Sequence, residues 1–181
     1  MAAQKRMMVR PRAGGFAPPP GEVPREGGVL ILLYPQNDAW QLPLILRTQD
    51  EGAHSGQVSL PGGRREGDES LAQTALREAQ EELGVSAQSV TLLGALTPLY
   101  IPASGYCITP SVGYVAQRPD FRPDPAEVQE LIESPLSLFL AETTVAEETW
   151  HFGDFPVQVP FYRVGIHKVW GATAMVLSEF T

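Results

Sequence analysis

The chain has 181 residues, of which 43% are hydrophobic, and a formal net charge of −8 from 13 Lys and Arg against 21 Asp and Glu. This length is typical of one domain with a sizeable core. So acidic a chain lacks the basic face that sequence-independent nucleic-acid binding requires, and we expect no nucleic-acid partner. A phosphate-rich ligand would need a divalent cation to mediate its contact with such a protein.

The N-terminal segment differs in composition from the rest of the chain. Residues 1–26 are rich in proline and glycine and lack periodicity, which predicts an irregular arm before a single domain over residues 27–181. The basic N-terminus lacks the apolar core of a signal peptide. No apolar run approaches the roughly 18 residues of a membrane-spanning helix. We therefore expect a cytoplasmic protein without a membrane partner.

Strand-like and helical patterns alternate along the domain. Short apolar runs predict strands over 27–35, 39–48, 90–100, 107–116 and 157–170. The first two runs flank Pro-Gln-Asn-Asp and predict a hairpin, and a glycine-rich loop with a short central strand follows over 49–63. Helices are predicted over 69–83, 126–141 and 171–180, with Pro135 interrupting the second. This interleaving predicts an α/β or α+β fold with a mixed sheet.

Carboxylates crowd the C-terminal half of the helix predicted over 69–83. Glu78, Glu81 and Glu82 lie three and four positions apart, on one helical face, where like charges oppose helix formation. They also lie near the helix C-terminus, where the helix dipole disfavours anions. Such violations of local rules tend to mark functional sites. A hard divalent cation would make the arrangement favourable, so the segment predicts an Mg²⁺ or Mn²⁺ site, with a solvated charged face as the alternative.

The spacing of this segment resembles the Nudix box, Gly-x5-Glu-x7-Arg-Glu-U-x-Glu-Glu-x-Gly-U, in which U is aliphatic. Every defined position matches, and these positions are Gly63, Glu69, Arg77, Glu78, Ala79, Glu81, Glu82, Gly84 and Val85. The resemblance implies an α/β/α sandwich, with the mixed sheet between helices, and metal-dependent hydrolysis of a nucleoside diphosphate linked to another moiety.

The resemblance also assigns roles inside the box. Glu78, Glu81 and Glu82 would bind the metal, with Glu78 and Glu82 in the catalytic centre. Glu69 would support the metal site or the loop. Arg77 would orient a glutamate of the centre through a salt bridge. The clustered metal would neutralise the diphosphate and lower the pKa of the attacking water.

The general base of the reaction is open at this point. Glu78 is one candidate, and a glutamate from a distal segment is the other. Glu127 matches that second description best, with Glu130 behind it, although both would also fit an exposed helix surface. A base has to lie within hydrogen-bond reach of the attacking water.

The segment upstream of the box is similar to the extra motif of coenzyme A pyrophosphatases. Arg47 and His54 keep the spacing of that motif, and the residues that follow also match, namely Gly56, Gln57, Pro61, Gly62 and Gly63. The resemblance implies cleavage of coenzyme A or a derivative to 3′,5′-ADP and 4′-phosphopantetheine, with Arg47, His54, Gly62 and Gly63 binding the substrate. Glu51 departs from the motif's apolar residue, which leaves the acyl-group preference open.

Two alternatives remain beside this interpretation. The first is another Nudix substrate, such as ADP-ribose, a dinucleoside polyphosphate or an oxidised nucleotide. The second is a non-enzymatic nucleotide-binding module, which would be expected to lose box glutamates that are all retained here. A small-molecule substrate is the expected partner of a coenzyme A pyrophosphatase and of any other Nudix hydrolase. A homodimer is compatible with the family.

Overall fold

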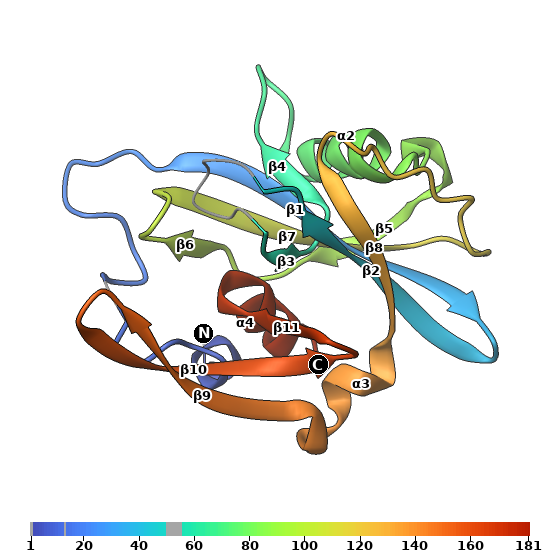
Figure 1. Ribbon diagram of the computed structural model, residues 1–181. Coiled ribbons are helices and arrows are strands. Elements are labelled where there is room, and N and C mark those ends of the chain that lie inside the picture. Colours follow the sequence, from blue (N-terminus) through green and yellow to red (C-terminus); the bar gives the residue numbers. More distant parts are fainter. Residues whose placement is uncertain (1, 13, 50–55) are drawn as a thin grey trace.

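The computed structural model describes residues 2–12, 14–49 and 56–181 as two β-sheets and their helices (Figure 1). Within the described residues, the large sheet contains eight strands: β1 (Arg25–Gln36), β2 (Ala39–Arg47), β3 (Val58–Ser59), β4 (Gly62–Arg64), β5 (Thr91–Ala95), β6 (Leu99–Ile101), β7 (Tyr106–Tyr114) and β8 (Val128–Pro135). The small sheet has the order β11–β10–β9, with β9 (Val145–Phe152), β10 (Phe155–Val164) and β11 (His167–Trp170). The helices are α1 (Ala2–Arg6), α2 (Leu71–Leu83), α3 (Leu136–Leu140) and α4 (Gly171–Phe180).

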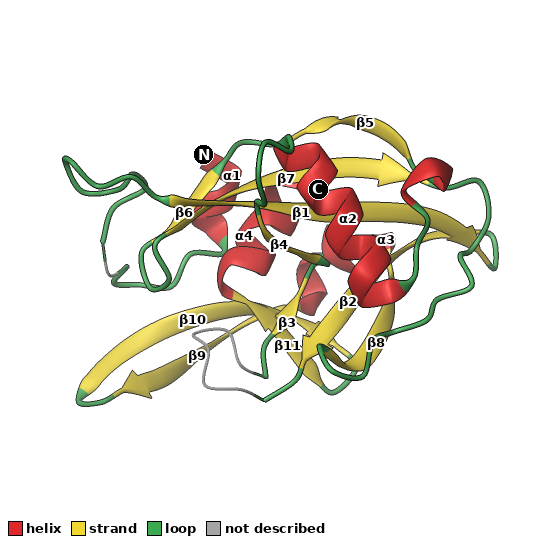
Figure 2. Cartoon of the chain, turned by 90° about the horizontal axis from the view of Figure 1, so that it is seen from above, coloured by secondary structure: helices red, strands yellow, loops and turns green. Residues whose placement is uncertain are grey.

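The sequence prediction of a mixed sheet between helices is confirmed. Strand β1 runs parallel to β7 and antiparallel to both β2 and β4. Helix α2 covers one face of the large sheet, across β1, and α4 lies on the other side, between the two sheets (Figures 1 and 2). One buried apolar cluster fills the space between the large sheet, α4 and the small sheet, and a second lies under α2.

The hairpin predicted at the start of the domain is also confirmed. Strands β1 and β2 pair through Tyr34 and Gln41 and are joined by Asn37 and Asp38, which have φ of 50° and 58°. Two successive left-handed residues match the twist of an antiparallel ribbon, and Asn and Asp tolerate that conformation. Within the strand-like residues 157–170, the end of β10 and β11 pair as a second hairpin.

The local sequence explains where α2 begins and ends. Ser70 Oγ accepts from the Gln73 N–H at 3.3 Å while Gln73 Oε1 accepts from the Ser70 N–H at 2.8 Å, a capping box that starts the helix two residues later than predicted. Gly84, with φ of 72°, ends it as expected. The helix can pack closely on β1 because Gly28 has no Cβ. A Cβ at this position would overlap the carbonyl oxygen of Leu71.

The helix predicted over 126–141 is wrong. Residues Val128–Pro135 form strand β8, paired with β2 from Gln41 to Arg47, and only Leu136–Leu140 is helical. The spacing of Val128, Leu131 and Ile132 fits a helical face, but β2 diverges from β1 and leaves its backbone groups open for pairing. Tertiary pairing therefore overrides the local pattern.

The segment for which an irregular arm was predicted, residues 1–26, contains helix α1 and the first two residues of β1. Gln4, 1% exposed, donates through Nε2 to the Thr97 carbonyl at 3.2 Å and to Glu179 Oε2 at 2.7 Å. Met7 is fully buried in the core between the sheets. A five-residue helix is too short to be stable alone, so these long-range contacts hold it. None of the helices in the described part of the chain is long and apolar enough to cross a membrane.

Replacing Met7 with Ala is expected to lower the free energy of unfolding by about 2 kcal/mol or more, because it leaves a cavity in the main core. Denaturant unfolding measures the change. Glu22→Ala, at an exposed position of the same segment, is the matched control and should stay within about 0.5 kcal/mol. Equal stability of the Met7 variant and the wild type would show that the N-terminal segment does not contribute to the fold.

Candidate active site

Glu82 is the buried carboxylate of the site. Its side chain is 0% exposed, and it accepts from Arg47 Nη1 at 3.1 Å and from the Gly62 N–H at 2.8 Å. Burial raises the pKa of Glu82 to about 8, and the charges of Glu78 and Glu127 act in the same direction, against the contacts from Gly62 and Arg47. The contacts from Gly62 and Arg47 therefore do not offset the cost of burying the negative charge of Glu82. A bound cation would offset it.

Glu78 lies against the backbone of β4. A Cβ at Gly63 would lie only 2.5 Å from the Glu78 carboxyl carbon. The glycine is thus needed for the approach of this carboxylate. Burial raises the pKa of Glu78, with Arg77 opposing and the charges of Glu81 and Glu127 adding to the rise.

Arg77 joins the loop before α2 to the acidic face of the helix. Its Nε and Nη2 donate to the two oxygens of Glu69 at 3.2 and 3.0 Å, and its Nη1 lies 2.9 Å from Glu78 Oε1 and 2.7 Å from Glu81 Oε2. Nη2 also donates to the Arg64 carbonyl at 2.9 Å. The fork of a guanidinium suits such paired carboxylates, so Arg77 fixes the positions of three of the four predicted metal-site glutamates.

Glu69 is held on several sides. Its Oε1 accepts from the Glu66 N–H at 2.8 Å and from Thr74 Oγ1 at 2.9 Å, besides the Arg77 contacts. Hydrogen bonds from Arg77, followed by the one from Glu66, lower the pKa of Glu69 to about 2. These contacts fit the support of the loop that the sequence suggested for Glu69, and its role as a metal ligand stays a prediction.

A turn between β7 and β8 brings Glu127 to the same place. Thr48 N–H donates to the Glu127 carbonyl at 3.1 Å, and Asp124 N–H donates to the Glu82 carbonyl at 3.0 Å. The turn is thereby fixed to the end of β2 and to the end of α2. The charge of Glu127 raises the pKa of both Glu78 and Glu82. Glu130, the second candidate for the base, instead lies 3.2 Å from His167 Nε2.

Hydrogen bonds and ring contacts that the sequence did not suggest attach the segment before Glu127 to the large sheet. Arg118 donates to Glu133 through Nε at 2.8 Å and Nη2 at 2.7 Å. The buried Tyr34 donates through its hydroxyl to Glu133 Oε2 at 2.6 Å. The Phe121 ring lies edge-on to Tyr34, with centroids 5.4 Å apart, and under Arg118. These contacts restrain the path from β7 to Glu127.

Hydrogen bonding from Arg118 lowers the pKa of Glu133. A depressed carboxyl pKa contributes stability above the ordinary pKa of glutamate, and that stability is lost as the pH falls through the folded-state value. Glu133→Gln is therefore expected to lower the free energy of unfolding by about 1 kcal/mol at pH 7, since the pair is partly solvated. The difference from the wild type should shrink toward pH 3. Thermal unfolding at both pH values measures it, and a pH-independent difference would contradict the ion pair's contribution.

The donor chemistry of the site fits a hard divalent cation. Across residues 2–12, 14–49 and 56–181, no three acidic, histidine or cysteine side chains form a ready-made metal cage. Mg²⁺ does not require one, because it is commonly held by one or two carboxylates together with water and substrate phosphates. Glu78 and Glu82 offer such oxygens beside Glu127, and their mutual repulsion is what a cation would remove. When bound, the metal would neutralise a diphosphate and acidify a water molecule.

Residues 24–150 match the NUDIX domain family. The chain belongs to the Nudix family. It is similar to a protein called an uncharacterized Nudix hydrolase NudL from Photorhabdus laumondii, at 36% identity over 144 residues, which cover 76% of this chain and 74% of that protein. It is also similar to the human mitochondrial coenzyme A diphosphatase NUDT8, at 34% identity over 163 residues, which cover 87% of this chain and 68% of that protein.

Solved Nudix structures share the fold of this member of the family. A MutT/nudix family protein from Enterococcus faecalis has a TM-score of 0.59 at 17% identity, over 91% of this chain and 63% of its own. A MutT NUDIX hydrolase from Burkholderia pseudomallei has a TM-score of 0.54 at 22% identity, over 88% of this chain and 100% of its own. These likenesses bear on the fold alone.

The sequence prediction of a Nudix hydrolase is therefore confirmed. The structure places Arg47 and the Gly62 N–H on the Glu82 carboxylate and brings the charge of Glu127 within electrostatic reach of Glu78 and Glu82. His54, predicted to bind substrate, lies outside the described residues. The functional roles assigned to the individual residues stay predictions.

Proposed function

We propose that this Nudix hydrolase cleaves the diphosphate bond of coenzyme A or its derivatives, giving 3′,5′-ADP and 4′-phosphopantetheine. One observation carries the proposal. The segment that resembles the coenzyme A motif is joined directly to the box, because Arg47 and the Gly62 N–H both bind the Glu82 carboxylate. Residues of the coenzyme A motif thus contact a carboxylate of the Nudix box, that of Glu82. The named activity of the human relative supports the same substrate.

Each predicted residue has a proposed part in the reaction. Glu78, Glu81 and Glu82 hold Mg²⁺ or Mn²⁺, and Arg77 orients Glu78 and Glu81 from its anchor on Glu69. Arg47 uses one nitrogen for Glu82, and its other N–H groups remain suited to a substrate phosphate oxygen. Gly62 and Gly63 form the backbone of the substrate site beside these carboxylates, and the missing Cβ of Gly63 leaves room for Glu78. The predicted cytoplasmic location and homodimer are part of this proposal.

Glu127 is the proposed general base. Its charge acts on both Glu78 and Glu82, and its turn is fixed by hydrogen bonds from the Thr48 N–H to the Glu127 carbonyl and from the Asp124 N–H to the Glu82 carbonyl. Glu127→Gln is expected to lower kcat by about a hundredfold or more, as general base catalysis contributes 10²–10⁴-fold. Glu130→Gln, on the adjoining strand and paired with His167, is the matched control and should keep kcat within about threefold. Equal effects of both substitutions would remove Glu127 from this role.

Substrate profiling tests the proposed specificity. Values of kcat/KM are measured for coenzyme A, an acylated and an oxidised coenzyme A, ADP-ribose and a dinucleoside polyphosphate, each with Mg²⁺ and with Mn²⁺. The proposal expects a coenzyme A compound to have the highest value. Cleavage of ADP-ribose alone would keep the Nudix chemistry and discard coenzyme A. Cleavage of none of these compounds would favour a nucleotide-binding module.

A further inference from the structure

Coenzyme A carries phosphate in two places, the diphosphate and a monoester at the 3′ position of the ribose. The second phosphate needs a cation that is not already used in the metal site. Arg47 is bound to Glu82, and Arg77 is bound to Glu69, Glu78 and Glu81. The resemblance assigned Arg47 to substrate binding, and its ion pair with Glu82 holds it beside the metal carboxylates.

One cation near the site, Arg64, has no side-chain partner among the described residues. The 13 Lys and Arg of the chain all lie in the described part. There, all of them except Arg64 and Arg163 have a side-chain hydrogen bond, an ion pair or a ring contact, and Arg163, on the small sheet, acts electrostatically on Glu148. The Arg64 side chain is exposed and has no such contact with any described residue. In a protein with net charge −8, an uncompensated arginine beside a phosphate-handling site is a candidate for ligand binding.

The strand register places Arg64 next to the metal carboxylates but on the other face of the sheet. In β4, Gly63 pairs with Gly28 and faces Glu78, whereas Arg64 pairs with Gly27. Successive side chains of a strand point to opposite faces, so Arg64 projects away from α2. Its carbonyl accepts from Arg77 Nη2, which fixes its backbone to the site. A group bound there is separated from the Glu78 carboxylate by the backbone of β4.

The surroundings of Arg64 are basic and open. Arg25 precedes Gly27 by two positions on the same face, its guanidinium lies 4.4 Å from the Tyr106 ring centroid, and it donates to the Ser104 carbonyl. An open cleft of about 330 Å³ is lined by Pro24, Arg25, Glu26, Arg64, Arg65, Gly67 and Asp68. Glu26 is already paired with Arg65 at 2.6 Å. The three arginines of this lining face two carboxylates, Glu26 and Asp68, so the cleft keeps one net positive charge, and it has room for a phosphate monoester.

We propose that Arg64, with Arg25 beside it, binds the phosphate monoester of the substrate, which in coenzyme A is the 3′-phosphate. This inference rests on the proposed function, since it names the group that distinguishes coenzyme A from its dephosphorylated form. The guanidinium fork of Arg64 makes charge-assisted hydrogen bonds to the phosphate oxygens. Arg64 therefore determines specificity and takes no part in the hydrolytic step.

Steady-state kinetics of Arg64→Ala with coenzyme A and with 3′-dephospho-coenzyme A test the proposal. For coenzyme A the KM should rise by about tenfold or more with kcat little changed, because a contact made equally in ground and transition states is lost. For the dephosphorylated substrate both constants should stay within about twofold. An equal change for both substrates, or no change for either, would overturn the proposal.

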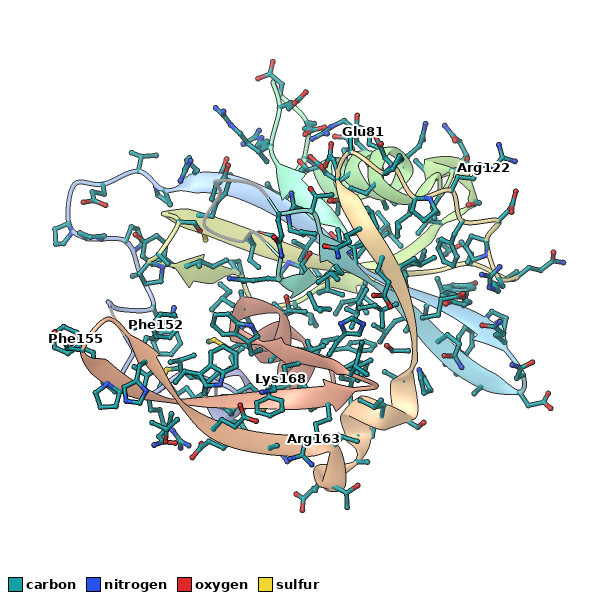
Figure 3. All side chains as sticks on the ribbon, viewed as in Figure 1. Glu81, Arg122, Phe152, Phe155, Arg163 and Lys168 are labelled. Carbon is teal, nitrogen blue, oxygen red and sulfur yellow. The ribbon has the colours of Figure 1, made fainter. Side chains whose placement is uncertain are left out.

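Two controls keep the result interpretable. Arg163→Ala removes another exposed arginine, on the small sheet, and Figure 3 shows it at the opposite end of the view from Glu81; it should leave both substrates unaffected. Thermal unfolding of Arg64→Ala should match the wild type, because the side chain has no described contact to lose.

The binding of product fragments separates this inference from the proposed function. Calorimetry compares the affinity of the wild type and of Arg64→Ala for 3′,5′-ADP and for 5′-AMP. A wild-type preference for 3′,5′-ADP that disappears in Arg64→Ala supports the subsite, even if coenzyme A proves not to be the substrate that is cleaved. Equal affinity of the wild type for the two nucleotides would refute the subsite, whatever the substrate profile.

Discussion

Glu82→Gln is expected to abolish turnover, with kcat/KM lowered by about a thousandfold or more. The amide keeps the size of the side chain and an oxygen for the Gly62 N–H, but it removes the negative charge that would hold a divalent cation. Loss of the metal removes both charge neutralisation and activation of water, each of which is worth several kcal/mol of transition-state stabilisation. Steady-state hydrolysis assays across a range of Mg²⁺ concentrations measure the effect.

The fold of this variant should survive. Glu82 is fully buried, and burial opposes its charged form in the absence of a cation, so a neutral isostere removes an unfavourable charge. The melting temperature in EDTA should equal or exceed that of the wild type, whereas added Mg²⁺ should stabilise only the wild type. Full activity of Glu82→Gln would contradict the assignment of the metal site. An unfolded variant would instead assign Glu82 a structural role.

Gly63→Ala is expected to lower kcat/KM by about a hundredfold while the protein stays folded. The new Cβ would lie 2.5 Å from the Glu78 carboxyl carbon and displace that carboxylate. Misplacing a catalytic group by about 1 Å costs a factor of this size. The displaced atoms are the end of a flexible side chain, so the clash is relieved locally. Kinetic assays together with circular dichroism measure the two effects separately.

Two other glycines provide matched controls for this substitution. Gly28→Ala places its Cβ against the backbone of α2, at the Leu71 carbonyl and 3.0 Å from the Ala75 nitrogen. We expect it to destabilise the protein strongly. At Gly15 the nearest atom to an added Cβ is 3.6 Å away, and Gly15→Ala should change neither stability nor activity. Wild-type activity of Gly63→Ala would mean that Glu78 is not needed where it lies.

The acidic face of α2 could be predicted because it depends on local spacing alone. Helical geometry brings Glu78, Glu81 and Glu82 to one face wherever the helix lies, and Gly84 marks the end of the helix by its own conformational preference. The strand pattern of the first hairpin has the same local character. These elements were predicted correctly, as was the mixed sheet.

Contacts between distant segments could not be predicted in this way. Strand β8 depends on the open edge of β2, and α1 depends on contacts from Gln4 to Thr97 and Glu179. The partner of Arg47 is likewise far away in the sequence, at Glu82. The approach of Glu127 follows from the path that Arg118 and its partners impose on the preceding segment. A residue pattern carries no signal for such pairings, because each partner alone is an ordinary polar residue.

The central claim is that the box carboxylates form a metal site that hydrolyses the diphosphate of coenzyme A. Its most direct test is mass spectrometry of coenzyme A incubated with the protein and Mg²⁺ in ¹⁸O-labelled water, with and without EDTA. The account predicts 3′,5′-ADP and 4′-phosphopantetheine, one of them carrying a single ¹⁸O atom, and no products in EDTA. Intact coenzyme A in the presence of Mg²⁺, or cleavage that persists in EDTA, would contradict it.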